Sequence, residues 1–299
     1  MSARASAARG SATRVGLGME LGSILTIQLA NAVASRLTTH VNPLGVTSLR
    51  LVFGAMMLGL IARPPILGLS RAELGLVLAF GATISVQSTA FYQAIARVPM
   101  GIAVTIAVLG PLGVAVAVSG GRRRVFWPVL AAAGVALLAS EYSSGRSVGL
   151  IGLAFAAVCG MSWACYIVLS ARAGVAFPGV QGLAMAVVVA AVLTLPAGIV
   201  ASGSALVRPR VLVTGLIIAV LTCAIAFSLE TLALKRLPKD IFGVFASLEP
   251  AAAAVVGLAT LGQGLSMKEV AGVLIVTAAC AGAAIRLRPT RTEPTRELF

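Results

Sequence analysis

Long apolar runs recur from one end of this 299-residue chain to the other. A helix needs roughly 20 mostly apolar residues to cross the hydrocarbon core of a bilayer. We identify ten such runs, bounded by charged residues, proline or glycine: residues 16–35, 43–62, 73–93, 100–118, 126–141, 148–170, 179–200, 210–232, 241–261 and 269–285. The sequence therefore predicts an all-α integral membrane protein with ten transmembrane helices.

The composition excludes an ordinary soluble protein. Apolar residues make up 59% of the chain and charged residues 11%, whereas soluble domains have about 45–50% and about 25%. Ten spans use about 200 positions. The short loops and tails that remain cannot hold a further domain of about 50 residues or more. We therefore expect the protein to act within the bilayer.

The net charge of +14 comes mainly from loops and tails, as in the cluster Arg122–Arg124. Such clusters are typical of segments that contact anionic lipid heads, whereas nucleic-acid binding needs a basic face on a soluble surface. We therefore expect membrane lipids, and no nucleic acid, as partners. If the N-terminus is cytoplasmic, 16 of the 23 basic residues lie on the cytoplasmic side and 6 on the other, with Arg50 inside the second span.

The positive-inside rule then places both termini in the cytoplasm, with tails at residues 1–15 and 286–299. The first apolar run continues to about Ser35, which is too long for a signal peptide. We expect this span to be retained.

An internal repeat links the two halves of the chain. Residues 94–116 align without gaps with residues 233–255, with nine identities in 23 positions. The informative identities are the pairs Arg97 and Arg236, Pro99 and Pro238, and Pro111 and Pro250. Because the copies lie five helices apart, they should have opposite orientations. The sequence thus predicts a 5+5 inverted-topology repeat, over residues 16–141 and 148–285, as found in secondary transporters.

Glu249 is the ionisable residue that lies deepest in the predicted membrane. It follows the start of its span, near Ile241, by eight residues, or about 12 Å of helix. An ionisable group near the bilayer centre costs about 2.5–3.5 kcal/mol. Pro250 follows directly and leaves the carbonyl of Ala246 without its usual partner. A carboxyl group beside exposed backbone polarity forms a polar site at which Glu249 can exchange a proton; a carboxyl satisfied by neighbouring helices is the alternative.

Gly110 and Pro111 occupy the equivalent position of the first copy, without the charge. Pro111 likewise frees the carbonyl of Ala107. Paired broken helices at corresponding positions indicate a binding site at the repeat interface. We expect the two breaks, at Gly110–Pro111 and Ala246–Pro250, to form its floor.

Other polar residues complete the candidate cavity. Glu20, Arg50 and Glu230 are ionisable, but each lies near enough to an end of its span for its charge to reach the membrane surface. The residues at mid-membrane depth are Gln28, Asn31, Gln87, Tyr92, Ser162, Trp163, Tyr166 and Ser247. Taken alone, each is better explained as a packing residue or an interhelical hydrogen bond than as part of a site, and Tyr92 also suits an outer aromatic belt. Their grouping favours a cavity.

The sequence lacks the residues of the common enzyme mechanisms. His40, the single histidine, lies in a loop, and the chain has no HExxH, no GxSxG and no P-loop. The four cysteines lie inside apolar runs, form no CxxC pair and are interpreted as core residues. We therefore expect no enzymatic activity, no metal and no cofactor, and transport that uses an ion or substrate gradient.

Three segments, taken in order, carry a resemblance to a known family. Gly45–Arg50, Val98–Leu112 and Phe227–Pro250 resemble EamA-type members of the drug/metabolite transporter superfamily, and within it the threonine/homoserine exporter branch. The resemblance implies a bacterial inner-membrane exporter with a central cavity between the repeats, driven by proton exchange. The residues that match the branch's motifs are Arg50, Pro111, Glu230, Glu249 and Pro250.

Two positions depart from that branch: Ala107, where relatives can carry glutamate, and Gln263, where glutamate is common. The first departure removes a carboxylate that could bind an amine. The fold is therefore better constrained than the substrate.

We expect an exporter of small amino acids such as threonine or homoserine. Glu249 would be the proton-coupled or amine-facing carboxylate, and Arg50 would meet the substrate carboxylate through its planar fork. The first alternative is a carrier of another metabolite or of a cationic drug, held by carboxylates and by Trp163 and Tyr166. The second is a non-transporting membrane protein, such as a scaffold or a lipid-modifying enzyme. The sequence leaves open the direction of transport and whether the chain forms a homodimer.

Overall fold

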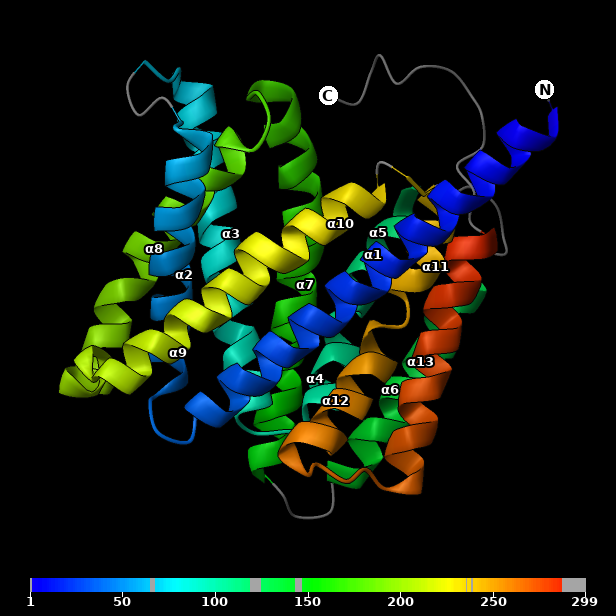
Figure 1. Ribbon diagram of the computed structural model, residues 1–299. Coiled ribbons are helices and arrows are strands. Elements are labelled where there is room, and N and C mark those ends of the chain that lie inside the picture. The colour runs from blue at the N-terminus through cyan, green and yellow to red at the C-terminus, as the bar shows by residue number, and fades with distance from the viewer. Residues whose placement is uncertain are drawn as a thin grey trace.

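The computed structural model describes residues 2–64, 68–118, 125–142, 147–234, 236–237 and 239–286. Within these ranges every regular element is a helix, and none is a strand (Figure 1). The α-helices are α1 (Ser2–Leu37), α2 (Pro43–Ala62), α3 (Arg71–Ile95), α4 (Met100–Ala107), α5 (Leu109–Val118), α6 (Phe126–Tyr142), α7 (Ser147–Ala176), α8 (Gln181–Ser202), α9 (Pro209–Ala219), α10 (Phe227–Leu234), α11 (Lys239–Ala246), α12 (Glu249–Leu261) and α13 (Met267–Arg286). Gly203–Val207 forms a 3-10 helix and Val220–Ala226 a π-helix.

Nine candidate membrane spans are present in the described residues, long and apolar enough to cross a bilayer. They correspond to nine of the ten expected runs. The remaining run, 126–141, forms α6, whose apolar part Phe126–Ser140 is shorter than the other spans. Because a spanning helix needs about 20 residues, the count of ten stays a prediction, as do the inverted repeat and the position of the termini.

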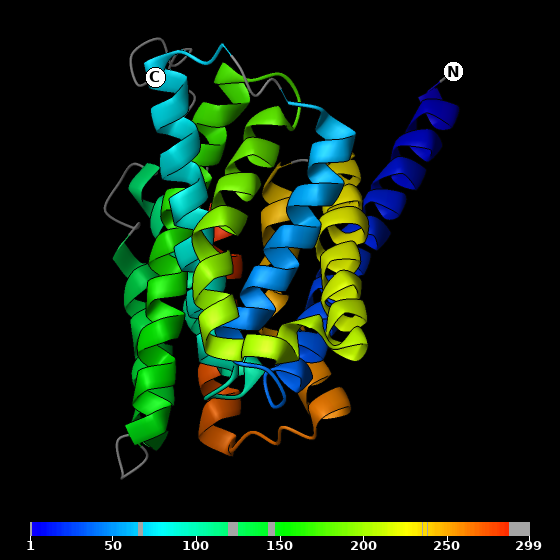
Figure 2. The same ribbon diagram turned by 90° about the vertical axis from the view of Figure 1, so that its left-hand side faces the viewer.

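The two expected tails differ in the structure. The first turns of α1 cover residues 2–15 and project from the bundle in both views (Figures 1 and 2). The expected C-terminal tail begins at the last residue of α13, and its remainder, residues 287–299, lies outside the described residues. The cluster Arg122–Arg124 and Pro238 also lie outside them.

The helices form two packed groups (Figure 1). Between them lie two long oblique elements, α1 and the continuous segment from α9 to α10. In one group α2 packs on α8, and α3 packs on both α7 and α8. In the other α6 packs on α13, and α4 packs on α12. α1 runs alongside α9, the π-helix and α10, and also touches α12. This pair therefore connects the groups, and the site described below lies beside it.

Apolar side chains fill the core and also cover the outside. Fully buried residues such as Phe80 and Ile102 lie between helices, whereas Leu60, Val175 and Val200 are more than 70% exposed. Lipid tails are as apolar as leucine, so burying such side chains away from lipid gains little. Polar hydrogen bonds and close packing hold the helices together instead. One example is the Ser48 hydroxyl of α2, which donates to the Thr194 carbonyl of α8 at 2.8 Å.

The helix breaks predicted from proline are confirmed. α4 ends at Ala107 and α5 begins at Leu109, while α11 ends at Ala246 and α12 begins at Glu249. Pro111 and Pro250 each lie in the first turn of the second helix. Backbone N–H groups there have no helical acceptor, so a missing N–H costs no hydrogen bond. The prolines thus start the second helix of each pair.

The expected span 210–232 contains an irregularity that we did not predict. α9, the π-helix Val220–Ala226 and α10 follow one another without a loop. π-helical turns inside α-helices are rare and occur frequently at functional sites. This one faces the cavity.

Candidate functional site

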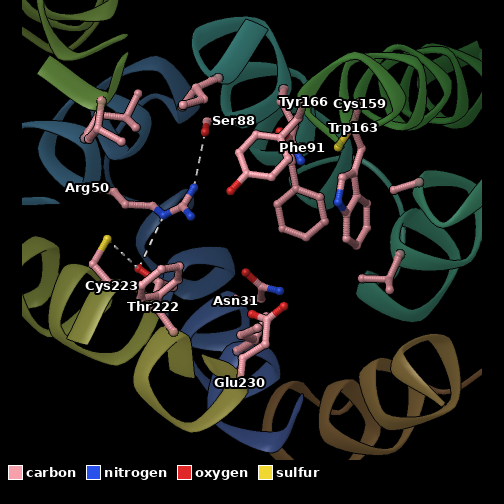
Figure 3. Close-up of a pocket in the computed structure, with 18 of the residues that line it drawn as sticks. Asn31, Arg50, Ser88, Phe91, Cys159, Trp163, Tyr166, Thr222, Cys223 and Glu230 are labelled. Carbon is pink, nitrogen blue, oxygen red and sulfur yellow. Dashed lines mark hydrogen bonds between the residues drawn. The ribbon is translucent and has the colours of Figure 1, made fainter. Parts of the chain in front are cut away.

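A cavity of about 310 Å³ lies between α1, α2, α3, α4, α7, α8, α12 and the segment from the π-helix to α10 (Figure 3). Its wall combines apolar side chains with a few polar groups. That combination is typical of sites for small molecules, which occupy about 300–1,000 Å³. The cavity lies at the small end of this range.

Arg50 of α2 supplies the positive charge. Its Nη1 donates to the Ser88 hydroxyl of α3 at 3.2 Å, and its Nε approaches the Thr222 hydroxyl at 3.5 Å (Figure 3). The guanidinium also lies 5.9 Å from the centre of the Tyr92 ring. Within the described residues no carboxylate forms an ion pair with it. Arg50 is therefore oriented by neutral groups, and its charge remains available to an anion.

Two carboxyl groups line the cavity on other helices. Glu230 belongs to α10, and in Figure 3 its carboxyl group lies beside Asn31. Glu249 is the first residue of α12, where the positive end of the helix dipole favours a negative charge. The two carboxyl groups interact electrostatically. They form an acidic side of the cavity, distinct from Arg50.

The amides of α1 provide a donor to the same cavity. Gln28 is fully buried and Asn31 is 8% exposed. The Asn31 Nδ2 donates to the Gln28 Oε1 at 3.2 Å. The Gln28 Nε2 has no hydrogen-bond partner in the described part of the chain. Since an unpaired buried donor costs about 1–3 kcal/mol, this amide is suited to an acceptor on a bound molecule.

Aromatic rings form a third part of the wall. Trp163 and Tyr166 of α7 and Phe91 of α3 lie together in Figure 3. The Phe80 ring packs against the Tyr166 ring, with 5.2 Å between the ring centres. Aromatic surface of this kind can cover an apolar side chain or a cation.

The structure brings together seven of the eleven residues that we predicted for the site. The residues on the cavity wall are Gln28, Arg50, Gln87, Trp163, Tyr166, Glu230 and Glu249. The other four, Gly110, Pro111, Ser247 and Pro250, do not line it. Functional roles for all eleven stay predictions.

Gly110 and Ser247 have other contacts. A Cβ atom on Gly110 would lie 1.9 Å from the Gly160 carbonyl oxygen, so α5 packs here directly on the backbone of α7. The Ser247 hydroxyl donates to the Val244 carbonyl at 2.5 Å, one turn back.

Sequence reasoning missed several residues of the wall. Ser88, Thr222, Cys159 and Cys223 line the cavity, although both cysteines looked like core residues. Ser88 follows Gln87 directly, so its position next to a predicted site residue could have identified it. Nothing in the sequence indicated Thr222, because its direction depends on the π-helix.

Two alternatives for single residues are wrong. Tyr92 does not belong to an exposed aromatic belt, since it is 1% exposed and lies under Arg50. Arg50 does not extend to the membrane surface, because Ser88 and Thr222 hold it at the cavity.

Comparisons with known proteins agree with this architecture. The model of the EamA-like transporter family matches residues 150–285. The threonine/homoserine exporter RhtA of Salmonella typhimurium (strain LT2) is 37% identical over 265 residues, 88% of this chain and 89% of the relative. RhtA of Escherichia coli (strain K12) is 36% identical over 270 residues, 90% of each chain. A solved crystal structure covers 95% of this chain and 100% of its own, with a TM-score of 0.57 and 23% identity, which shows the fold alone.

Apolar spans, a polar cavity and transporter relatives define a multi-pass transporter of the inner membrane. The chain belongs to the EamA-like transporter family, as the resemblance of its motifs implied.

Proposed function

We propose that this transporter exports small zwitterionic amino acids, of the size of threonine or homoserine, in exchange for protons. The observation that carries the proposal is the separation of charge in the cavity. Arg50 lies on one side without a carboxylate partner in the described residues, and Glu230 and Glu249 lie on other helices. The names of relatives at 36–37% identity over most of the chain support the same substrate class.

A zwitterion satisfies both sides of this cavity. The planar guanidinium of Arg50 can donate two parallel hydrogen bonds to the substrate carboxylate. Glu230 and Glu249 can accept from the ammonium group, and the free Nε2 of Gln28 can donate to a hydroxyl oxygen of the substrate. The small volume of about 310 Å³ favours short side chains over bulky ones.

Proton exchange follows from the chemistry of the carboxyl groups. A protonated Glu249 carries no charge and holds an ammonium group less strongly, so binding a proton favours substrate release. The two halves, residues 16–141 and 148–285, would alternate access around the broken helices. This cycle takes both termini as cytoplasmic and needs no second subunit.

Labelled amino acids preloaded into proteoliposomes test the proposal. We expect threonine or homoserine to leave faster when a proton gradient is imposed. Unlabelled threonine should compete with this efflux, whereas its methyl ester, which lacks the carboxylate, and its 2-hydroxy analogue, which lacks the ammonium, should compete at least about tenfold less well. Absence of amino-acid flux, in vesicles that hold folded protein, would overturn the proposal. Equal competition by the methyl ester would instead favour a carrier of cations.

A further inference from the structure

Glu20 of α1 is buried but lies outside the cavity wall. It follows Arg14, where the first span begins, by six residues, so it lies about 9 Å inside the span. Ile27, the first residue of α1 on the cavity wall, is about 10 Å further along. The Glu20 side chain is 3% exposed. The carboxyl group is therefore enclosed by protein, and it does not line the cavity.

The Glu20 carboxyl group is also incompletely satisfied. Its Oε2 has no hydrogen-bond partner in the part of the chain that the structure describes. An isolated carboxylate in such surroundings is unfavourable, and a neutral carboxyl group is much less so. Glu20 is therefore suited to binding and releasing a proton.

α1 is fixed against the cavity-lining segment at this level. The Ser23 hydroxyl, one turn beyond Glu20, donates to the Ala226 carbonyl of the π-helix at 2.9 Å. A Cβ atom on Gly22 would lie 3.4 Å from the Cδ1 of Leu229, the residue before Glu230. These contacts place Glu20 and Glu230 on adjacent turns of neighbouring helices.

Three carboxyl groups consequently form a series that leads out of the cavity. Glu20 interacts electrostatically with Glu230, and Glu249 interacts with both. The other charged side chains described near this part of α1 are Arg14, which is exposed and lies six residues before Glu20 on the same helix, and Arg236, which lies beside Gly16. The Arg236 Nη1 donates to the Leu232 carbonyl, and the side chain is exposed. No basic side chain among the described residues pairs with the three carboxyl groups.

We propose that Glu20 is a proton-transfer residue that connects the carboxyl groups of the cavity with water at the N-terminal end of α1. Protonated Glu249 gives its proton to the Glu230 carboxylate, which leaves Glu249 charged and Glu230 neutral. Glu230 passes the proton to the Glu20 carboxylate in the same way, and Glu20 releases it to that water as hydronium. Each transfer occurs directly or through one water molecule. The inference rests on the proposed proton exchange, and it adds a route for the proton that does not pass through the substrate.

Glu20→Gln separates this role from substrate binding. Two fluxes are measured in proteoliposomes: efflux driven by a proton gradient over a range of pH, and exchange of labelled for unlabelled threonine without a gradient. We expect the driven efflux to fall at least about tenfold and to lose its pH dependence. Exchange needs no net proton movement and should stay within about twofold. Glu20→Asp keeps the carboxyl group and should restore part of the driven efflux.

Glu269→Gln is the matched control. Glu269 is also buried, at 8% exposure, but its Oε2 accepts from the backbone N–H of Ser266 at the start of α13. Glutamine can fill this capping position, so both fluxes should persist. Full pH-dependent efflux in Glu20→Gln would overturn the inference, as would loss of both fluxes in folded protein. If the wild-type protein shows no exchange, the proposed function fails, and the inference fails with it.

Discussion

The two broken helices use the same backbone feature for different purposes. In both, a helix ends at alanine and a new one begins before a proline, Pro111 or Pro250. The first break is packed: Gly110 lies against the Gly160 backbone, and Ala107 adds an apolar surface to the cavity. The second break is charged, because Glu249 begins α12 and lines the cavity. A break in a membrane helix can therefore provide close packing or a place for a carboxyl group.

The two broken helices also contact each other away from their breaks. A Cβ atom on Gly101 of α4 would lie 2.8 Å from the Ala254 Cα of α12. The Gln263 Oε1, just beyond α12, accepts from the Met100 N–H at the start of α4 at 2.9 Å. Glutamine fills this capping position as glutamate would. The departure at Gln263 therefore preserves the contact between α12 and α4. The departure at Ala107, in contrast, changes the cavity wall.

Gly110→Ala should have the largest effect, because it disrupts the packing of the first break against α7. The added methyl group would meet the Gly160 carbonyl oxygen, a backbone atom that cannot rotate away. We expect a loss of about 1–3 kcal/mol of stability or more, seen as a lower yield of monodisperse protein and a lower unfolding temperature in detergent. Gly113→Ala on the same helix is the control, since nothing lies within 4 Å of its added Cβ. Equal stability of the two variants would contradict a packing role for Gly110.

Glu249→Gln should have the next largest effect, because it removes the carboxyl group of the second break. The variant should fold, while proton-driven efflux should fall at least about tenfold. Adding Ala107→Glu to this variant places a carboxyl group on the same cavity wall at the other break, and should restore part of the flux. Full transport with unchanged pH dependence in Glu249→Gln would show that the assigned role is wrong.

Ser247→Ala should have the smallest effect. The Ser247 hydroxyl donates within its own chain segment and not into the cavity, so its loss should cost about 0.5–1.5 kcal/mol of stability. Transport should stay within about twofold. Thr105→Val is the counterpart in the first broken helix, because the Thr105 hydroxyl donates to the Gly101 carbonyl in the same way. A severe transport defect in Ser247→Ala alone would indicate that its hydroxyl reaches the substrate.

Much of the fold could be predicted because its signals are local. Apolar length located nine of the spans, and Pro111 and Pro250 marked both helix breaks. The bounds of α6 were predicted to within one residue, but its apolar part, Phe126–Ser140, is shorter than the other spans, so a tenth span stays a prediction. The relation between the halves rests on few informative identities, and it stays a prediction.

The site was less predictable because side-chain direction depends on packing. Depth in the membrane identified Glu249, yet depth alone suggested that Arg50 and Glu20 could reach the surface. Ser88 and Thr222 hold Arg50 inward, and neighbouring helices enclose Glu20. Gly110 looked like part of a cavity floor, because a glycine in a sequence does not reveal which backbone lies against it.

The π-helix Val220–Ala226 gives this span room for a one-residue change in length. Each α-helical residue turns the chain by about 100° around the helix axis, and a π-turn carries one residue more than an α-turn. Deleting one residue between Thr222 and Phe227 would close the wide turn into an α-turn, so Glu230 would keep nearly its present direction. The same deletion in α9, a regular α-helix, would rotate everything that follows by about 100° relative to the start of the span. The loss of a single codon therefore has opposite consequences in two adjoining segments of one helix, a difference that comparisons based on substitutions alone would overlook.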